Sequence, residues 1–396
     1  MSLHSTVSAN RVHIAFFGRR NAGKSSVVNA VTNQNLSVVS EYKGTTTDPV
    51  KKAMELLPLG PVVITDTAGF DDEGELGALR VEKTREVLRR TDIAVLVADS
   101  QLGLGEAEEQ LIREFSDRKL PYLVAYNKCD LLSDRPALPE NALYVSALTG
   151  EGIDDLKERL ASLIKERPDE KKIVVDIMDG STAVLVIPVD ESAPKGRLIL
   201  PQQLTIRELL DHHMTAVCCQ PEELKTLLSH LKEKPSIVIT DSQAFERVSA
   251  DTPEDIPLTS FSILFARYKG SLNTLVQGAK AIGTLQDGDK VLIAEGCTHH
   301  RQCNDIGAVK MPRWIEEFTG KKPEYEFSSG AGYPDDLSKY KLIVHCGGCM
   351  LNEKEMQYRM KAAKDAGVPV VNYGMAIAHM HGILKRALKP FESHIN

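Results

Sequence analysis

A phosphate-binding loop near the N-terminus restricts the fold of this chain more than any other feature. An apolar, strand-like run, Val12 to Phe17, leads directly into Gly18-Arg-Arg-Asn21-Ala-Gly23-Lys24-Ser25, which satisfies the pattern G-x-x-x-x-G-K-[ST]. In such a loop backbone N–H groups surround a β-phosphate, the lysine neutralises the β and γ oxygens, and the serine offers a hydroxyl to Mg²⁺. A strand that ends in this loop predicts an α/β nucleotide-binding fold.

Two further segments supply groups for Mg²⁺ and the γ-phosphate. A second buried strand ends in Asp66-Thr-Ala-Gly69, where the carboxylate can hold Mg²⁺ through water and the Gly69 N–H can sense the γ-phosphate. Between the two strands lies Gly44-Thr-Thr46-Thr-Asp48, whose Thr46 can close over Mg²⁺. The order of these segments predicts a nucleotide-dependent switch.

Two later segments select the base. Asn127-Lys128-Cys129-Asp130 follows an apolar strand, and the Asp130 carboxylate can accept from both N1–H and the exocyclic amine of guanine. Adenine offers no such pair of donors, so we expect GTP and not ATP. Ser146-Ala147 adds a backbone N–H for the guanine oxygen. The predicted GTP and Mg²⁺ site comprises Gly18, Asn21, Ala22, Gly23, Lys24, Ser25, Ser26, Thr46, Asp66, Gly69, Asn127, Lys128, Asp130, Ser146 and Ala147.

Over residues 11 to about 165 the chain resembles the TrmE/Era/EngA branch of the translation-factor-like GTPases, whose second loop has the Gly-x-Thr-x-Asp pattern of Gly44 to Asp48. Phe70 stands where other GTPases place a catalytic glutamine, so we expect slow intrinsic hydrolysis. The resemblance implies that Asn21 helps to bind K⁺, which supplies positive charge between the phosphates. The catalytic groups are then Lys24, Asn21, Thr46 and Gly69.

Composition limits the compartment and the partners. The seven cysteines are an odd number, and the polar N-terminus has no positively charged start that leads into an apolar run. We therefore expect a cytoplasmic protein with reduced thiols and no membrane span. The formal net charge is −7, and no dense Lys/Arg stripe with interleaved aromatics is present. This pattern argues against nucleic acid as a partner.

Soft metal ligands follow two short apolar runs in the C-terminal part. Lys341 to Val344 leads into His345-Cys346-Gly-Gly-Cys349, and Lys290 to Ala294 leads into Glu-Gly-Cys297-Thr-His299-His300. The carboxyl ends of parallel strands face one crevice, so both groups could meet in one site. Spacing alone leaves zinc and iron–sulfur open. The ligand inventory is Cys297, His299, His300, Cys303, Asp305, His345, Cys346 and Cys349.

The length of 396 residues predicts more than one domain. We expect a GTP-binding domain over 1–168, a connector over 169–264 and a ligand-bearing domain over 265–396, each of α/β type, with the third doubly wound. Residues 173–177 are a predicted strand of the connector, and residues 376–388 are a single predicted closing helix. His212-His213 and Cys218-Cys219 are poor candidates for a metal site, because adjacent residues point in different directions.

As a whole, the P-loop segment, Cys-x-His and a distant His-Cys-x-x-Cys resemble the HydF family of [FeFe]-hydrogenase maturation GTPases. The resemblance implies a [4Fe-4S] cluster on Cys297, Cys346 and Cys349, with His299, His345, Cys303 or Asp305 as the candidate fourth ligand. It also implies a homodimer through residues 169–264. Such a protein is a scaffold or carrier, which receives a diiron precursor transiently from radical-SAM maturation enzymes and delivers it to apo-[FeFe]-hydrogenase.

A different class of function uses the same cysteines. Cys297, Cys303, Cys346 and Cys349 could hold a structural zinc ion in a GTPase that modifies RNA or assembles ribosomes. The missing basic patch weighs against this alternative. A radical enzyme would need a Cys-x-x-x-Cys-x-x-Cys run, which the sequence lacks.

Overall fold

The computed structural model describes residues 11–34, 50–69, 75–165, 171–189, 198–296, 305–330, 332–348 and 351–394. The chain divides into two compact units, residues 1–169 and residues 170–396. Each unit is an α/β structure, which confirms the predicted fold class. Among the described residues, no helix is both long and apolar enough to cross a membrane.

The first unit is built on a six-stranded sheet with the order β2-β3-β1-β4-β5-β6. Only β2 runs antiparallel to its neighbour β3, and the other pairs are parallel. Its strands are β1 (Val12–Phe17), β2 (Val50–Leu56), β3 (Gly60–Asp66), β4 (Ile93–Asp99), β5 (Tyr122–Asn127) and β6 (Ala142–Tyr144). Its helices are α1 (Lys24–Thr32), α2 (Glu75–Arg90), α3 (Glu106–Asp117) and α4 (Ile153–Lys165).

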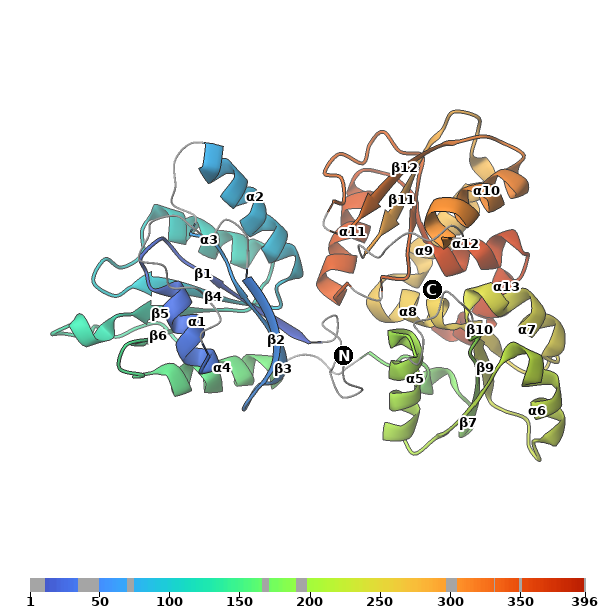
Figure 1. Cartoon of the computed structure of the whole chain (residues 1–396), viewed down its shortest axis with the longest axis horizontal. Helices are drawn as coiled ribbons and strands as arrows, with labels where there is room; N and C mark the ends of the chain where they lie inside the picture. The colour runs from blue at the N-terminus through green and yellow to red at the C-terminus, as the bar shows by residue number, and fades with distance from the viewer. Residues whose placement is uncertain are drawn as a thin grey trace. The chain divides into compact units, whose positions relative to one another are not determined.

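Both faces of this sheet are covered, so its central strands are apolar on both sides. Along β1, Ile14 and Phe16 pack into the core shared with α1 and α4, whereas Ala15 and Phe17 pack into the core shared with α2 and α3. This alternation is the period of two that an extended chain imposes. Figure 1 shows α1 and α4 on one side of the sheet and α2 and α3 on the other.

The second unit contains two parallel four-stranded sheets, β10-β9-β7-β8 and β12-β11-β13-β14. In each sheet the first strand has its two successors on opposite sides, which is a doubly wound order. The first sheet contains β7 (Thr182–Val186), β8 (Thr215–Cys219), β9 (Ile237–Thr240) and β10 (Leu258–Ser260), with helices α5 (Leu200–Asp211), α6 (Leu224–His230), α7 (Phe245–Asp251) and α8 (Phe261–Lys269). The second contains β11 (Lys290–Glu295), β12 (Glu324–Ser329), β13 (Leu342–His345) and β14 (Val370–Asn372), with helices α9 (Leu272–Ala281), α10 (Met311–Thr319), α11 (Glu353–Asp365), α12 (Tyr373–Met380) and α13 (Leu384–Leu388).

One hydrophobic core runs through both sheets of this unit, from Ile173 to Phe391. Helix α8 packs against α5 of the first sheet and against α9, α11 and α12 of the second. The domain boundary expected at residue 264 lies inside this helix. The two sheets are therefore joined by a helix that belongs to both.

Two predicted elements of the second unit are wrong. Residues 173–177 are not a strand but contain a short helical turn, Val175–Ile177, because the Glu208 carboxylate accepts hydrogen bonds from the backbone N–H groups of Ile173, Val174 and Val175. The closing helix is two helices, α12 and α13, because Gly382 adopts a left-handed φ of 74° between them.

Candidate functional site

The phosphate-binding loop lies between β1 and α1 in the first unit. Asn21 and Gly23 both have positive φ, at 64° and 83°, which turns the chain sharply before α1 begins at Lys24. A Cβ on Gly18 would lie 2.4 Å from the Val97 carbonyl oxygen, and one on Gly23 would lie 2.2 Å from Asn127 Nδ2. Both positions therefore need glycine, and the loop has the close packing that a phosphate cradle requires.

Lys24, Ser25 and Asp66 meet at the end of β3. Lys24 Nζ is paired with Asp66 Oδ1, and Ser25 Oγ donates to Asp66 Oδ2 at 2.6 Å. Lys24 and Asp66 are both buried, so each charge offsets the cost of burying the other. This arrangement gathers an ammonium group for phosphate oxygens with a hydroxyl and a carboxylate that suit Mg²⁺.

The base-binding segments converge on the same loop. Asn127 Nδ2 donates to the Ala22 carbonyl at 2.9 Å, and its Oδ1 accepts from the Ala147 N–H at 3.0 Å. One side chain thus ties the phosphate loop to the base loop. Asp130 is exposed at the rim, where its Oδ1 accepts from Ser146 Oγ at 2.6 Å.

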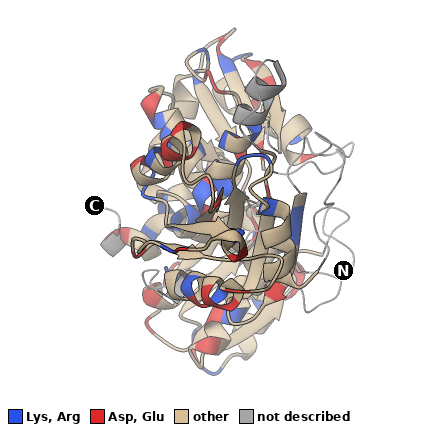
Figure 2. Cartoon of the chain, turned by 90° about the vertical axis from the view of Figure 1, so that its left-hand side faces the viewer, with Lys and Arg blue, Asp and Glu red and all other residues tan. Residues whose placement is uncertain are grey.

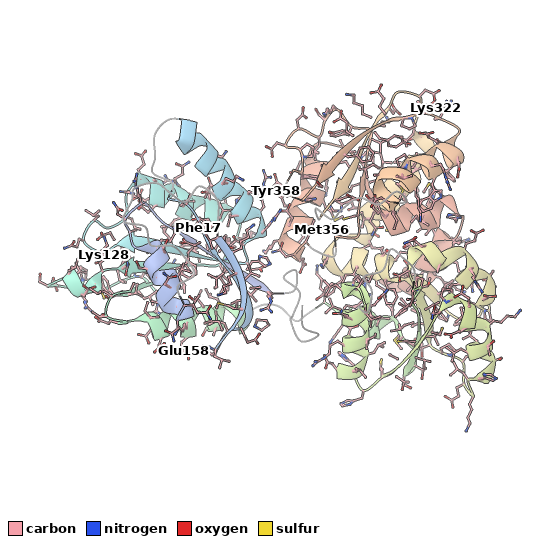
Figure 3. All side chains as sticks on the ribbon, in the orientation of Figure 1. Phe17, Lys128, Glu158, Lys322, Met356 and Tyr358 are labelled. Carbon is pink, nitrogen blue, oxygen red and sulfur yellow. The ribbon has the colours of Figure 1, made fainter. Side chains whose placement is uncertain are left out.

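Sequence reasoning missed three residues that brace this pocket, namely Asp99, Arg135 and Glu151. The predicted Lys128, labelled in Figure 3, pairs at 2.6 Å with Asp99, the last residue of β4. Arg135 donates to the Cys129 carbonyl at 3.2 Å and to Glu151 Oε2 at 3.1 Å, and this hydrogen bond lowers the pKa of Glu151. No spacing rule points to Arg135, because its partners come together only in the fold.

The remaining predicted groups of the nucleotide site divide into two sets. Gly69 follows β3 in the loop where Thr67 Oγ1 donates to the Phe16 carbonyl at 2.7 Å. Ser26 lies in the first turn of α1, next to Ser25. Thr46 and Phe70 lie outside the described residues, so their predicted roles stay predictions.

Asp130→Asn should relax the preference for guanine. An amide accepts only one of the two guanine donors and presents an N–H of its own, and the loss of a charged hydrogen bond of about 1.5–3 kcal/mol corresponds to roughly 10- to 150-fold weaker binding. GTP and ATP binding by calorimetry measures this, with Asp134→Asn in the same exposed loop as the control. Unchanged selectivity in Asp130→Asn would contradict the assignment of the base pocket.

A second site lies at the switch point of the sheet β12-β11-β13-β14. Cys346 follows β13, and its Sγ accepts hydrogen bonds from the backbone N–H groups of Gly296 at 3.1 Å and Gly348 at 3.4 Å. Gly296 directly follows the neighbouring strand β11 and precedes Cys297 in the sequence. Ligands of doubly wound sheets bind at such a point, and N–H groups directed at sulfur suit a thiolate that holds a metal.

His345 is buried, and both of its ring nitrogens have partners. Nδ1 is 2.7 Å from the Cys346 carbonyl, and Nε2 is 3.1 Å from Arg359 Nη1. A guanidinium can only donate, so Nε2 is the acceptor and Nδ1 carries the proton. Burial and then the charge of Arg359 lower the pKa of His345 to about 4. Ligation of iron by His345 would require that one of these two contacts be replaced.

Arg359 is the largest fully buried side chain among the residues that the structure describes. Its Nε donates to Glu355 at 2.9 Å, its Nη2 donates to the Gly330 carbonyl at 2.5 Å, and its guanidinium stacks 4.7 Å from the ring centre of Tyr333. These contacts hold the group that fixes the tautomer of His345. The sequence contains no signal for this role, since arginines on helices are usually exposed.

Two carboxylates lie at the same end of the sheet, the buried Glu295 and the partly buried Asp305. Glu295 ends β11, and its Oε1 accepts from Tyr373 Oη at 3.3 Å. Burial and then the nearby Cys346 raise the pKa of Tyr373. Asp305 Oδ1 accepts from the Ala308 N–H at 2.7 Å at the start of the next helical segment. Glu295 was missed, although its place beside Gly296 at a strand exit could have marked it.

The other predicted ligands cannot be placed. Five of the eight residues of the ligand inventory lie outside the described residues, namely Cys297, His299, His300, Cys303 and Cys349. The structure therefore locates Cys346, His345 and Asp305 of that set.

Three family models match successive parts of the chain. Residues 13–128 match the 50S ribosome-binding GTPase family, residues 173–270 match the hydrogen maturase F dimerization domain, and residues 273–390 match the hydrogen maturase F tetramerization domain. The fold and the nucleotide site define a P-loop GTPase. With these two C-terminal domains behind the GTPase domain, the chain belongs to the hydrogen maturase F family.

Curated relatives that are similar to part of this chain include tRNA modification GTPases. The tRNA modification GTPase MnmE of Chromobacterium violaceum is 35% identical over 158 residues, which are 39% of this chain and 35% of that protein. MnmE of Xanthomonas oryzae pv. oryzae is 36% identical over 153 residues, 38% of this chain and 34% of its own length. The chain thus spans about a third of the length of these relatives.

Two solved structures illustrate the structural comparison. Era of Aquifex aeolicus bound to GDP and aluminium fluoride is 18% identical, covers 61% of this chain and 99% of its own, and has a TM-score of 0.35. NFeoB from S. thermophilus bound to GDP, aluminium fluoride and K⁺ is 21% identical, covers 38% of this chain and 61% of its own, and has a TM-score of 0.30.

Proposed function

We propose that this GTPase is a scaffold or carrier that holds a [4Fe-4S] cluster and assembles or delivers the diiron precursor of [FeFe]-hydrogenase. The observation that carries the proposal is Cys346, a thiol at the switch point of a doubly wound sheet, with two backbone N–H groups directed at its sulfur. It stands in a chain of the hydrogen maturase F family, in which Asn127 donates to the Ala22 carbonyl and Asp130 accepts from Ser146, contacts that support the proposed guanine pocket.

The described residues fit such a cluster. Cys346 is partly exposed, and the N–H groups of Gly296 and Gly348 would stabilise its thiolate. Cys297 follows Gly296 directly, and Cys349 follows Gly348, so we propose these three cysteines as ligands. His299, His345, Cys303 and Asp305 stay the candidates for the fourth position. When bound, the cluster would supply one iron with a weaker ligand, to which the diiron unit could attach.

Oligomers and partners follow from the same proposal. Residues 169–264 would form the homodimer, and among the described strands of that sheet β8 lies at an edge and pairs only with β7. An edge strand offers backbone N–H and C=O groups to a second copy. The cargo would come from radical-SAM maturation enzymes and pass to apo-[FeFe]-hydrogenase in the cytoplasm. In Figure 2, acidic and basic residues are interspersed over the helices of the first unit, which does not suit nucleic acid.

Anaerobic iron and sulfide analysis with EPR spectroscopy tests the proposal. The proposal would be supported by a brown protein that binds up to four iron atoms per chain, gives a [4Fe-4S] signal and activates apo-hydrogenase. A colourless protein with bound zinc would instead support the alternative, a GTPase with a four-cysteine zinc domain that acts on RNA.

GTP hydrolysis should be faster in KCl than in NaCl at equal ionic strength. We propose that Asn21, which is exposed at a left-handed position of the phosphate loop, helps to bind K⁺. The K⁺ ion would supply positive charge to the phosphates in a site that lacks a catalytic glutamine. Asn21→Ala should remove the difference between the two salts. Asn33→Ala, at another exposed left-handed asparagine, is the control. Equal rates of the wild type in the two salts would contradict the K⁺ site.

A further inference from the structure

A buried lysine holds the loop that carries Cys346. Lys269, the last residue of α8, is only 3% exposed, and its Nζ donates to the Leu351 carbonyl at 2.8 Å and to the Gly348 carbonyl at 3.3 Å. The cavity on which Lys269 and Cys346 both border is about 20 Å³, room for about one water molecule. The Gly348 carbonyl also accepts from the Leu351 N–H at 3.0 Å. Because little solvent can replace the lysine, the Leu351 carbonyl depends most on its ammonium group.

The hydrogen bond from Lys269 is made to Gly348, the residue that also donates a hydrogen bond to the thiol of Cys346. Gly348 receives Lys269 on its carbonyl and donates its own N–H to Cys346 Sγ. Its φ is +62°, and a Cβ there would lie 2.6 Å from Met356 Sδ, on α11 in Figure 3. Gly348, with its left-handed backbone, and the hydrogen bonds from Lys269 thus hold the loop in one conformation.

Arg267, two residues before Lys269 in the last turn of α8, binds a second segment, residues 172–176. Arg267 donates to Asp176 at 2.6 and 3.0 Å, and to the carbonyls of Lys172 at 2.7 Å and Ile173 at 3.2 Å. Residues 172–176 are the part of the chain that follows the GTPase unit, which ends at residue 169. Glu208 holds the N–H groups of the same segment, so it is anchored from two helices.

A third contact joins the two regions directly. Lys171 Nζ is 2.7 Å from Glu353 Oε1, at the start of α11 and two residues after Leu351. Both side chains are about half exposed, so this ion pair adds little stability by itself. It shows that the segment behind the GTPase unit and the loop of Cys346 are neighbours within the second unit.

We propose that the last turn of α8 links these two regions: Lys269 positions the loop of Cys346, and Arg267 ties that turn to residues 172–176, so that nucleotide-dependent movement of this segment changes the loop. Lys269 and Arg267 are positioning residues in this inference and have no part in GTP chemistry. The inference rests on the proposed function for its biological meaning, since it supplies a route from the nucleotide to the cluster ligands.

The test measures the accessibility of Cys346 in the full chain without iron. The protein is loaded with GDP or with a non-hydrolysable GTP analogue and Mg²⁺, treated briefly with iodoacetamide, and the alkylation of Cys346 is quantified by peptide mass spectrometry. The variants are Lys269→Met, Lys269→Arg and Arg267→Gln, with Lys361→Met on the exposed face of α11 as the matched control.

We expect the two nucleotides to give different alkylation rates in the wild type and in Lys361→Met. Lys269→Met should be alkylated about tenfold faster with either nucleotide, as the loss of a buried charged hydrogen bond implies. Lys269→Arg, which can still donate to both carbonyls, should restore the wild-type rate. Arg267→Gln should keep the wild-type rate with GDP and lose the difference between nucleotides.

Two results would overturn the inference. Alkylation of Lys269→Met at the wild-type rate would show that the lysine does not position the loop. A wild type without a nucleotide effect, or Arg267→Gln with the full effect, would show that the link does not exist. Should Lys269→Met not fold by circular dichroism, Lys269→Gln carries the same test. Iron content of the wild type is measured separately, and its absence would contradict the proposed function without affecting the alkylation result.

Discussion

In the Lys24→Ala variant we expect GTP turnover to fall by about 100- to 1,000-fold, as is typical when one group that stabilises transition-state charge is removed. In the proposed site, the ammonium group of Lys24 binds the β and γ phosphate oxygens. Its removal also leaves the buried Asp66 without its cationic partner, so thermal stability should fall as well. Phosphate release measures turnover, and a melting curve separates the two effects.

The iron content of Lys24→Ala should equal that of the wild type. All groups of the predicted nucleotide site lie within residues 18–147, and we assign no group of the second unit to it. Lys157→Ala is a suitable control, because Lys157 lies on α4 and pairs only weakly with the exposed Asp154. Normal turnover in Lys24→Ala would refute the assignment of the phosphate loop.

The opposite result is expected for Cys346→Ser. Serine has nearly the same shape but is a poor ligand for iron, so the loss of one of three thiolates should prevent stable retention of the cluster. GTP turnover should stay at the wild-type value. Iron and sulfide analysis, the EPR signal and phosphate release measure the three quantities on one sample.

Cys218→Ser provides the matched control for this experiment. Cys218 is an exposed cysteine on β8, outside the proposed cluster site, and its substitution should change neither iron nor turnover. We expect Cys349→Ser to behave like Cys346→Ser. Full iron content in Cys349→Ser would mean that the site must be rebuilt around Cys303. Both Cys346→Ser and Lys24→Ala should fail to activate apo-hydrogenase.

The nucleotide site was largely predictable, because its groups lie in short contiguous segments. The phosphate loop and the Asn127 to Asp130 segment each combine a strand end with residues of fixed chemistry, and the fold brings them together as expected. Arg135 and Glu151 were not predictable, since they lie 16 positions apart in the sequence, with β6 between them, and their side chains meet only in the fold.

The fold class was predictable for a similar reason. Buried parallel strands leave continuous apolar runs in a sequence, as in β4, β11 and β13. Elements at the margins were less predictable. Residues 173–177 have the composition of a strand, but the carboxylate of Glu208, 33 to 35 residues away, accepts their N–H groups and excludes them from a sheet.

The sequence by itself determined the α/β class of both units, and it predicted which residues would hold phosphate, guanine and a soft metal. Only the tertiary structure decided how the thiol site is supported. Arg359 reaches His345 from α11, and Lys269 reaches Leu351 across 82 residues of sequence. Such roles belong to buried charges that are tolerable only where distant backbone groups satisfy them, and no local pattern records which groups those are.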